Sequence, residues 1–187
     1  MPPRLDLIRR PNIDPAVRPV YNRDSPWHGL ELAPRFPTID TPVDPRGELL
    51  ATLSTGGVRA ALIELNRASG YRFTALYRFD DPLARNLYFY DRENPGVEAG
   101  DDYPVEASYC VYVRDGVAPF VVEDAPDGPV LAGQAVRGQV KAYCGVPVFD
   151  RDGRTFASLC HFDLTAVPAD AECVALMETL ARHLARA

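Results

Sequence analysis

The segment at residues 141–163 constrains the fold of this chain more than any other. Two runs rich in β-branched, aromatic and small apolar residues flank a D-R-D-G turn at 150–153, and Gly153 can adopt the positive φ that a tight hairpin connection needs. The pattern predicts a β-hairpin. Both of its faces are apolar, whereas a strand pair solvated on one face would alternate apolar and polar residues. We therefore expect a hairpin that is covered on both faces and central in its sheet.

The segments on either side of the hairpin predict further helices and strands. Asp44 and Pro45 place an N-cap oxygen before a proline at the first helical position, which indicates a helix start. Gly56 and Gly57 each disfavour a helix interior by roughly 1 kcal/mol, so we expect a break near residue 55. Residues 104–114 fit either a short helix or a strand. The other expected elements are strands at 72–79, 85–91 and 118–123 and a C-terminal helix that begins at Pro168, with an apolar stripe at Cys173, Met177, Leu180 and Leu184.

Charge and hydropathy argue against two classes of partner. The chain has 20 basic and 26 acidic residues and a net charge of −6, and the basic residues are scattered, so no footprint for nucleic-acid or lipid phosphates is present. The N-terminus lacks the apolar run of a secretory signal, and no stretch approaches the roughly 20 apolar residues of a membrane span. We expect a cytoplasmic protein that binds neither nucleic acid nor membrane.

The chain divides into an extension and one domain. Residues 1–44 carry nine prolines, so neither a helix nor a central strand should persist there. They predict a proline-rich N-terminal extension that packs over the domain or a second subunit, with disorder as the alternative. Residues 45–187 are long enough to bury a sizeable core without disulfides. The four cysteines lack C-x-x-C spacing, which predicts buried thiols in a reducing compartment.

Two stretches carry a family resemblance. The hairpin reads Y-C-G-V-P-V at 143–148, D-R-D-G at 150–153 and S-L-C-H-F-D at 158–163. This pattern resembles the C-terminal half of GAF domains, and residues 108–113 match the S-x-C-x-x-V that these domains commonly show. The chain departs from the family pattern where Ala157-Ser158 replaces a Gly-Thr pair and where His161 follows the cysteine. The resemblance covers roughly residues 45–187.

The resemblance implies both an architecture and a function. The expected fold is α+β, a GAF-like (profilin/PAS-like) central antiparallel sheet with the N- and C-terminal helices on one face and with loops and short helices covering a pocket on the other. GAF domains of this kind imply a non-enzymatic sensory domain that binds a small molecule and acts through a homodimer or a separate effector protein. The ligand and any cofactor stay open, because the pockets of this family take cyclic nucleotides, haem, bilins or amino-acid-like metabolites.

Eight residues are candidates for the pocket wall, because small-molecule sites combine aromatic walls with a few polar groups. The long glycine-rich connection at 124–139 is the candidate lid over this pocket. The candidate ligand-binding residues are Tyr77, Tyr88, Tyr90, Ser108, Cys110, Asp124, Tyr143 and His161.

Catalytic alternatives find little support in the sequence. Free methionine-(R)-sulfoxide reductases are GAF enzymes whose catalytic cysteine lies before the strand that starts at Lys141 here, but residues 125–139 contain no cysteine. Cys160 and His161 are neighbours in a strand and should point to opposite faces, which argues against a cysteine–histidine pair. The other alternative to a ligand-binding domain is a purely structural interaction module whose pocket is filled by its own side chains.

Two further arrangements depend on the register of the hairpin. If Cys144 and Cys160 face each other across the two strands, a reversible disulfide is conceivable, and a one-residue slip reverses the face. His161 and Asp163 share a strand face, and a cross-strand Cys144 would complete three possible metal ligands. A hydrogen-bonded His161 and a turn-capping Asp163 are the simpler interpretation, and we expect no metal site.

Overall fold

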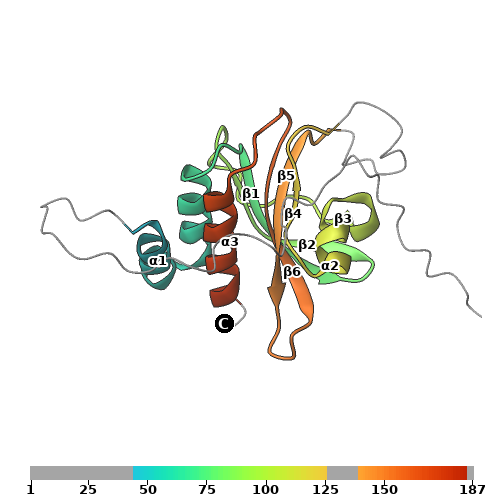
Figure 1. Cartoon of the computed structure of the whole chain (residues 1–187), viewed down its shortest axis with the longest axis horizontal. Helices are drawn as coiled ribbons and strands as arrows, with labels where there is room; N and C mark the ends of the chain where they lie inside the picture. Colours follow the sequence, from blue (N-terminus) through green and yellow to red (C-terminus); the bar gives the residue numbers. More distant parts are fainter. Residues whose placement is uncertain (1–43, 126–138, 185–187) are drawn as a thin grey trace, which may run out of the picture.

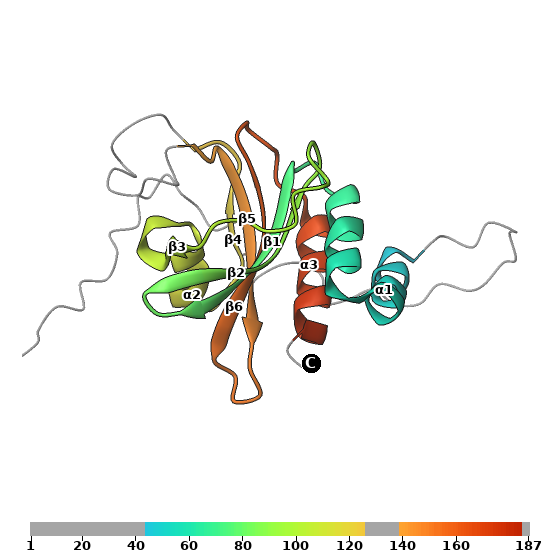
Figure 2. The same cartoon turned by 180° about the vertical axis from the view of Figure 1, so that it is seen from behind.

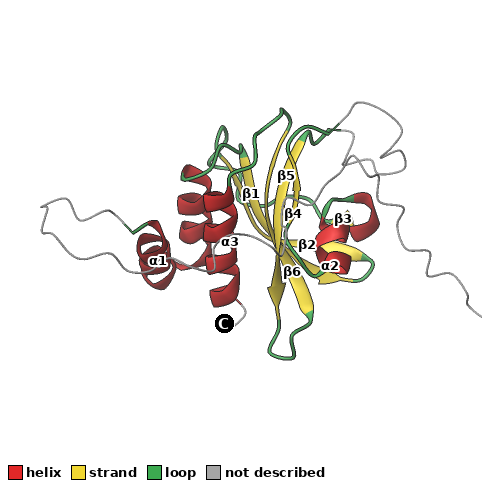
Figure 3. Cartoon of the chain, viewed as in Figure 1, coloured by secondary structure: helices red, strands yellow, loops and turns green. Residues whose placement is uncertain are grey.

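A six-stranded antiparallel sheet forms the middle layer of the protein in a computed structural model that describes residues 44–125 and 139–184. Helices α1 (Pro45–Arg67) and α3 (Ala171–Leu184) pack together on one face, while the 3-10 helix η1 (Val105–Ala107) and helix α2 (Cys110–Gly116) lie on the other (Figures 1 and 3). The strand order is β3-β2-β1-β6-β5-β4. The strands are β1 (Phe73–Asp80), β2 (Leu83–Asp91), β3 (Tyr103–Pro104), β4 (Phe120–Val122), β5 (Ala142–Phe149) and β6 (Thr155–Asp163). The expected α+β fold is confirmed.

The hairpin of β5 and β6 matches the prediction from its sequence. Gly153 adopts a φ of 78° in the turn, and the Asp150 carboxylate accepts hydrogen bonds from the backbone N–H groups of Asp152 and Arg154. β6 lies between β1 and β5, and β5 lies between β6 and β4. Both strands are therefore interior, and helices cover both of their faces.

Alternate residues of these strands belong to two separate hydrophobic cores. The helix-side core, beneath α1 and α3, contains Cys144, Val146 and Leu159. The pocket-side core, beneath α2, contains Tyr143 and Cys160. This alternation follows from the pleat of the strands, in which successive side chains point to opposite faces.

The register settles how the two hairpin cysteines lie. Cys144 is paired with His161, and Gly145 is paired with Cys160. The Cys144 side chain therefore joins the helix-side core and the Cys160 side chain the pocket-side core. They do not face each other, so a disulfide between them is excluded by the fold.

Helix α1 begins and bends where its sequence predicts. The Asp44 carboxylate accepts a hydrogen bond from the Arg46 N–H at 3.1 Å, and proline follows the cap directly. Gly57, with φ 75° and ψ −174°, interrupts the helical conformation. The first half of the helix lies farther from the sheet than the second half (Figures 1 and 2). The break expected near residue 55 is confirmed.

Removing this cap is expected to weaken the start of α1. An Asp44→Ala variant leaves the first-turn N–H groups without a side-chain acceptor, which should lower the free energy of unfolding by about 1 kcal/mol. Urea unfolding measures the change, and hydrogen exchange should show faster exchange in the first turn of α1. Asp124→Ala, which removes an exposed aspartate outside any helix, is the control. Equal effects of the two substitutions would contradict the capping role.

Three other elements differ in extent from the expectation. Residues 104–114 form η1 and α2 and part of β3, rather than a single helix or strand. The strand expected at 118–123 is limited to β4, and the C-terminal helix begins at Ala171 rather than at Pro168. Its predicted apolar stripe is buried. The candidate lid at 124–139 and the extension at 1–44 lie almost wholly outside the described residues.

Candidate functional site

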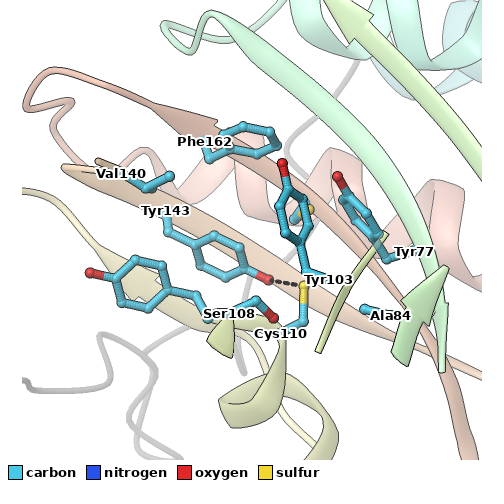
Figure 4. Close-up of a pocket in the computed structure, with 10 residues that line it drawn as sticks. Tyr77, Ala84, Tyr103, Ser108, Cys110, Val140, Tyr143 and Phe162 are labelled. Atoms are coloured by element: carbon cyan, nitrogen blue, oxygen red, sulfur yellow. Dashed lines mark hydrogen bonds between the residues drawn. The ribbon is translucent and has the colours of Figure 1, made fainter. Parts of the chain in front are cut away.

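A cavity of about 50 Å³ lies between the sheet and α2 (Figure 4). Its walls are formed by residues of strands β1, β2, β3, β5 and β6, of helix α2, and of the segments that precede α2 and β5. None of the residues that line it carries a formally charged Asp, Glu, Lys or Arg side chain. The lining residues are Tyr77, Ala84, Tyr103, Ser108, Tyr109, Cys110, Val140, Tyr143, Cys160 and Phe162.

Tyr143 crosses the middle of this site. Its ring lies over Gly145 on the same strand, where a Cβ atom would stand 2.7 Å from the Tyr143 Cε1 atom. A side chain at position 145 would therefore displace the ring. From this position the Tyr143 hydroxyl donates a hydrogen bond to Cys110 Sγ at 3.4 Å (Figure 4). It also lies 3.2 Å from Ser158 Oγ.

Aromatic rings form most of the wall. The Tyr109 and Tyr143 ring centroids are 5.2 Å apart, and those of Tyr77 and Tyr103 are 6.3 Å apart. Burial raises the pKa of Tyr77 and Tyr143 well above the ordinary value of 10.0. Their hydroxyls therefore stay protonated at neutral pH and can donate a hydrogen bond.

The two cysteines of the site differ in acidity. Hydrogen bonding with Cys160 lowers the pKa of Cys110 below its ordinary value of 9.0, helped by Tyr143 and opposed by burial. The pKa of Cys160 is raised well above 9.0 by its hydrogen bond to Cys110 and by burial. Of the two, Cys110 is therefore the thiol that loses its proton more readily.

The structure brings together half of the residues that the sequence singled out. Tyr77, Ser108, Cys110 and Tyr143 line the cavity. The other four are not among its lining residues. Tyr88 packs against the helix-side core, and Tyr90 is paired with Thr74 on the neighbouring strand. His161 contacts the Thr74 side chain, and Asp124 is exposed.

Sequence reasoning missed six residues of the wall. A signal for two of them was present, because Cys160 and Phe162 alternate with His161 along β6 and so must point to the face opposite the histidine. Tyr103 and Val140 each follow a connecting segment that has no helical or strand periodicity, so no pattern in the sequence marks them as wall residues. The six are Ala84, Tyr103, Tyr109, Val140, Cys160 and Phe162.

His161 belongs to a buried polar network on the helix side. Its Nδ1 atom lies 2.7 Å from Thr74 Oγ1, which accepts a hydrogen bond from Asn66 Nδ2 at 2.8 Å. Its ring stacks on Tyr71 with the centroids 5.4 Å apart. Burial lowers the pKa of His161 to about 3, so the imidazole is neutral at physiological pH. This arrangement joins β6 to β1 and α1.

The possible metal ligands are engaged otherwise. The Asp163 carboxylate accepts hydrogen bonds from the Arg72 N–H at 2.8 Å and from the Thr165 N–H and hydroxyl at 2.9 and 2.8 Å. It caps the turn after β6, as the simpler interpretation predicts. Within residues 44–125 and 139–184, no three His, Cys, Asp or Glu side chains come together as a metal site. No helix in the same ranges combines the length and the apolar character needed to cross a membrane.

Solved structures with the same architecture are GAF domains. The protein is similar to the GAF domain from an Acinetobacter phosphoenolpyruvate-protein phosphotransferase, with a TM-score of 0.62, 13% identity, and coverage of 76% of this chain and 89% of that one. The corresponding domain from Coxiella burnetii gives a TM-score of 0.59 and 17% identity at the same coverage. A type II free methionine-R-sulfoxide reductase from Thermoplasma acidophilum gives 0.53 and 14%, with coverage of 76% and 94%.

The sequence itself supports the same assignment. No curated protein matches the chain, but the profile of the GAF domain matches residues 57–187, which is more than half of its length. At identities of 11–18% the solved structures establish the fold alone. The matched range includes both stretches that carry the pattern, and on these grounds the chain belongs to the GAF domain family.

Proposed function

We propose that this chain is a sensory or regulatory GAF domain that binds a small molecule in the cavity beside α2 and is not itself an enzyme. The observation that carries this proposal is the cavity, with its aromatic walls and its few converging polar groups, a combination typical of small-molecule sites. Tyr77, Ser108, Cys110 and Tyr143 are its proposed ligand-binding residues.

The chemistry of the wall narrows the ligand class. Tyr103 and Phe162 are only half buried and can contact a planar molecule. The oxygens of Tyr143 and Ser108, whose hydroxyls donate to Cys110 and to the Val105 carbonyl, are polar groups of the wall. The described lining has no cation that would pair with a phosphate. An uncharged planar molecule therefore fits the described wall better than a nucleotide does.

The helix side suggests how binding is passed on. β5 and β6 contribute to both cores, so a shift of these strands at the cavity also reaches α1 and α3. The proposed output is a homodimer formed through the helix layer, or docking of that layer to a separate effector. The four cysteines are free, and we place the protein in the cytoplasm because buried free thiols are usual in reducing compartments.

Native mass spectrometry tests ligand binding. The protein purified from cells should have a larger mass under native conditions than after denaturation, by the mass of one small molecule. A Tyr103→Ala variant removes one aromatic wall and should lower the bound fraction about tenfold, the equivalent of about 1.4 kcal/mol. Tyr112→Ala removes a half-buried tyrosine that does not line the cavity and should leave the bound fraction unchanged. Equal losses in both variants, or no excess mass in the native protein, would contradict the proposed site.

A further inference from the structure

Two of the residues that line the cavity are cysteines that interact with each other. Cys110 begins α2 and Cys160 lies in the middle of β6, and their exposed fractions are 4% and 1%. Both line the cavity. Cys144 and Cys173 lie in the helix-side core instead, so the sheet separates the four cysteines into two pairs with different surroundings.

Hydrogen bonds give the two cavity thiols different roles. Cys110 Sγ accepts a hydrogen bond from the Tyr143 hydroxyl at 3.4 Å, while the Cys160 thiol donates to the Ala75 carbonyl oxygen at 3.7 Å. With Tyr143 donating to Cys110, the Ser158 hydroxyl, 3.2 Å from the Tyr143 oxygen, donates in turn to that oxygen. The chain of donors ends on Cys110, which can hold a negative charge while Cys160 keeps its proton.

The acidity of the four thiols follows this geometry. Interactions with Cys160 and Tyr143 lower the pKa of Cys110 below its ordinary value of 9.0, against the opposing effect of burial. Burial raises the pKa of Cys173 to about 12 and that of Cys144 well above its ordinary value. Because the thiolate is the nucleophile, Cys110 is the most reactive of these three thiols.

The size and polarity of the cavity select a small neutral reactant. A buried water molecule needs a cavity volume of roughly 10–15 Å³, and this cavity has a volume of about 50 Å³. This is enough for a molecule of two or a few heavy atoms without movement of the wall. Hydrogen peroxide has two heavy atoms and no charge, and it therefore matches both the size and the uncharged lining of the cavity.

We propose that Cys110 and Cys160 are a peroxide-reactive thiol pair, in which Cys110 is oxidised first and Cys160 closes a disulfide with it. This reactivity uses the same cavity as the ligand binding proposed above but does not require that ligand, because it needs only the two thiols and space for the oxidant. It is also distinct from the Cys144–Cys160 pairing that the register excludes.

The chemistry is balanced in two steps. The Cys110 thiolate attacks one peroxide oxygen: an S–O bond forms, the O–O bond breaks, and the departing hydroxide takes up a proton and leaves as water. Cys160 then gives up its proton and attacks the Cys110 sulfenic acid. The S–S bond forms, the S–O bond breaks, and the hydroxide leaves with that proton as a second water. The two thiols lose two electrons, and one peroxide becomes two waters.

Peptide mapping of the whole chain tests the proposal. The reduced protein is treated with hydrogen peroxide, alkylated with N-ethylmaleimide in denaturant and digested for mass spectrometry. The expected product is a Cys110–Cys160 disulfide that dithiothreitol reverses, with Cys144 and Cys173 recovered in alkylated form. Oxidation spread evenly over the four cysteines, or a disulfide that forms only after unfolding, would overturn the proposal.

Variants separate the roles of the two residues. Cys160→Ser should accumulate the sulfenic acid on Cys110, which dimedone captures, and Cys110→Ser should give no dimedone adduct at any cysteine. Tyr143→Phe removes the hydrogen bond to Cys110 and should slow its oxidation about tenfold, the rate equivalent of about 1.4 kcal/mol. The matched controls are Cys144→Ser and Cys173→Ser, which should oxidise at the wild-type rate. Dimedone labelling of Cys160 in the Cys110→Ser variant at the wild-type rate would reverse the assigned order and refute it.

Discussion

Lowering the pH from 7 to 5 is expected to reduce the free energy of unfolding by about 2 kcal/mol through one side chain, His161. Its pKa is about 3 in the folded protein and 6.5 ordinarily. Below pH 6.5 the unfolded chain binds a proton that the folded protein does not, so stability falls as pH falls, by about 1.4 kcal/mol per pH unit. Urea unfolding at pH 7, 6 and 5 measures this slope.

The surroundings of His161 supply no compensating charge. Thr74 and Asn66 offer neutral hydrogen-bonding groups, Tyr71 offers a ring face, and the Arg92 cation lowers the pKa further. The cross-strand neighbour Cys144 stays a neutral thiol, because burial raises its pKa. A backbone hydrogen bond at Phe73 favours the imidazolium but does not offset the cost of burial, so we expect protonation to weaken the buried network.

Two variants isolate the contribution of this histidine. His161→Phe keeps a ring against Tyr71 and should remove most of the slope between pH 6.5 and 5, whatever its stability at pH 7. His183→Gln changes a histidine on α3 that is less buried and should retain the slope. The Arg72 hydrogen bonds hold the pKa of Asp91 below 3.8, so stability from that carboxylate is lost only at lower pH. A slope that persists in His161→Phe would assign the acid sensitivity to other groups.

The second large effect is expected from Gly145→Ala. The added Cβ would stand 2.7 Å from Tyr143 Cε1, and the ring cannot retreat easily because Tyr109 and Phe120 pack against it. Overpacking of a core usually lowers the free energy of unfolding by about 1–3 kcal/mol. Displacing the ring also removes the hydrogen bond to Cys110, so the pKa of that thiol should rise. Urea unfolding and a pH titration of the Cys110 alkylation rate measure the two effects.

A double mutant shows whether the tyrosine ring is the cause. Combining Gly145→Ala with Tyr143→Ala removes the clash, so the pair should be less destabilising than the sum of the single substitutions. Gly96→Ala, at a site where a Cβ meets nothing within 4 Å, should change stability by less than about 0.5 kcal/mol. Strict additivity of the pair would mean that Gly145 is needed for a reason other than room for the ring.

The fold was more predictable than the site because a strand that is buried on both faces has apolar residues at successive positions, and this pattern is visible in the sequence. Residues 141–163 are apolar on both faces, and only an interior hairpin satisfies that pattern. The Asp44 cap and the Gly57 break follow from the backbone preferences of single residues. Each of these features is local, so no knowledge of partners distant in the chain was needed.

The site depended on pairings that no local pattern encodes. The face of Cys144 relative to Cys160 changes with a one-residue slip, and the register itself shifts between Val148 and Phe149. A second shift, between Leu76 and Tyr77, leaves Tyr88 opposite Leu76 and Asn86 opposite Tyr77. Tyr88 packs with Leu76 on the helix side, while Tyr77 lines the cavity.

The division of β6 between two cores gives each face of the sheet its own set of side chains for protein engineering. Leu159 supports the helices, whereas Cys160 and Phe162 shape the cavity. Every second residue of the strand can thus be redesigned for a new guest while the residues that carry most of the helix packing stay untouched. Residues that shape the cavity and residues that pack against the helices occupy alternate positions of one strand, so substitutions that change ligand binding can leave the helix packing in place.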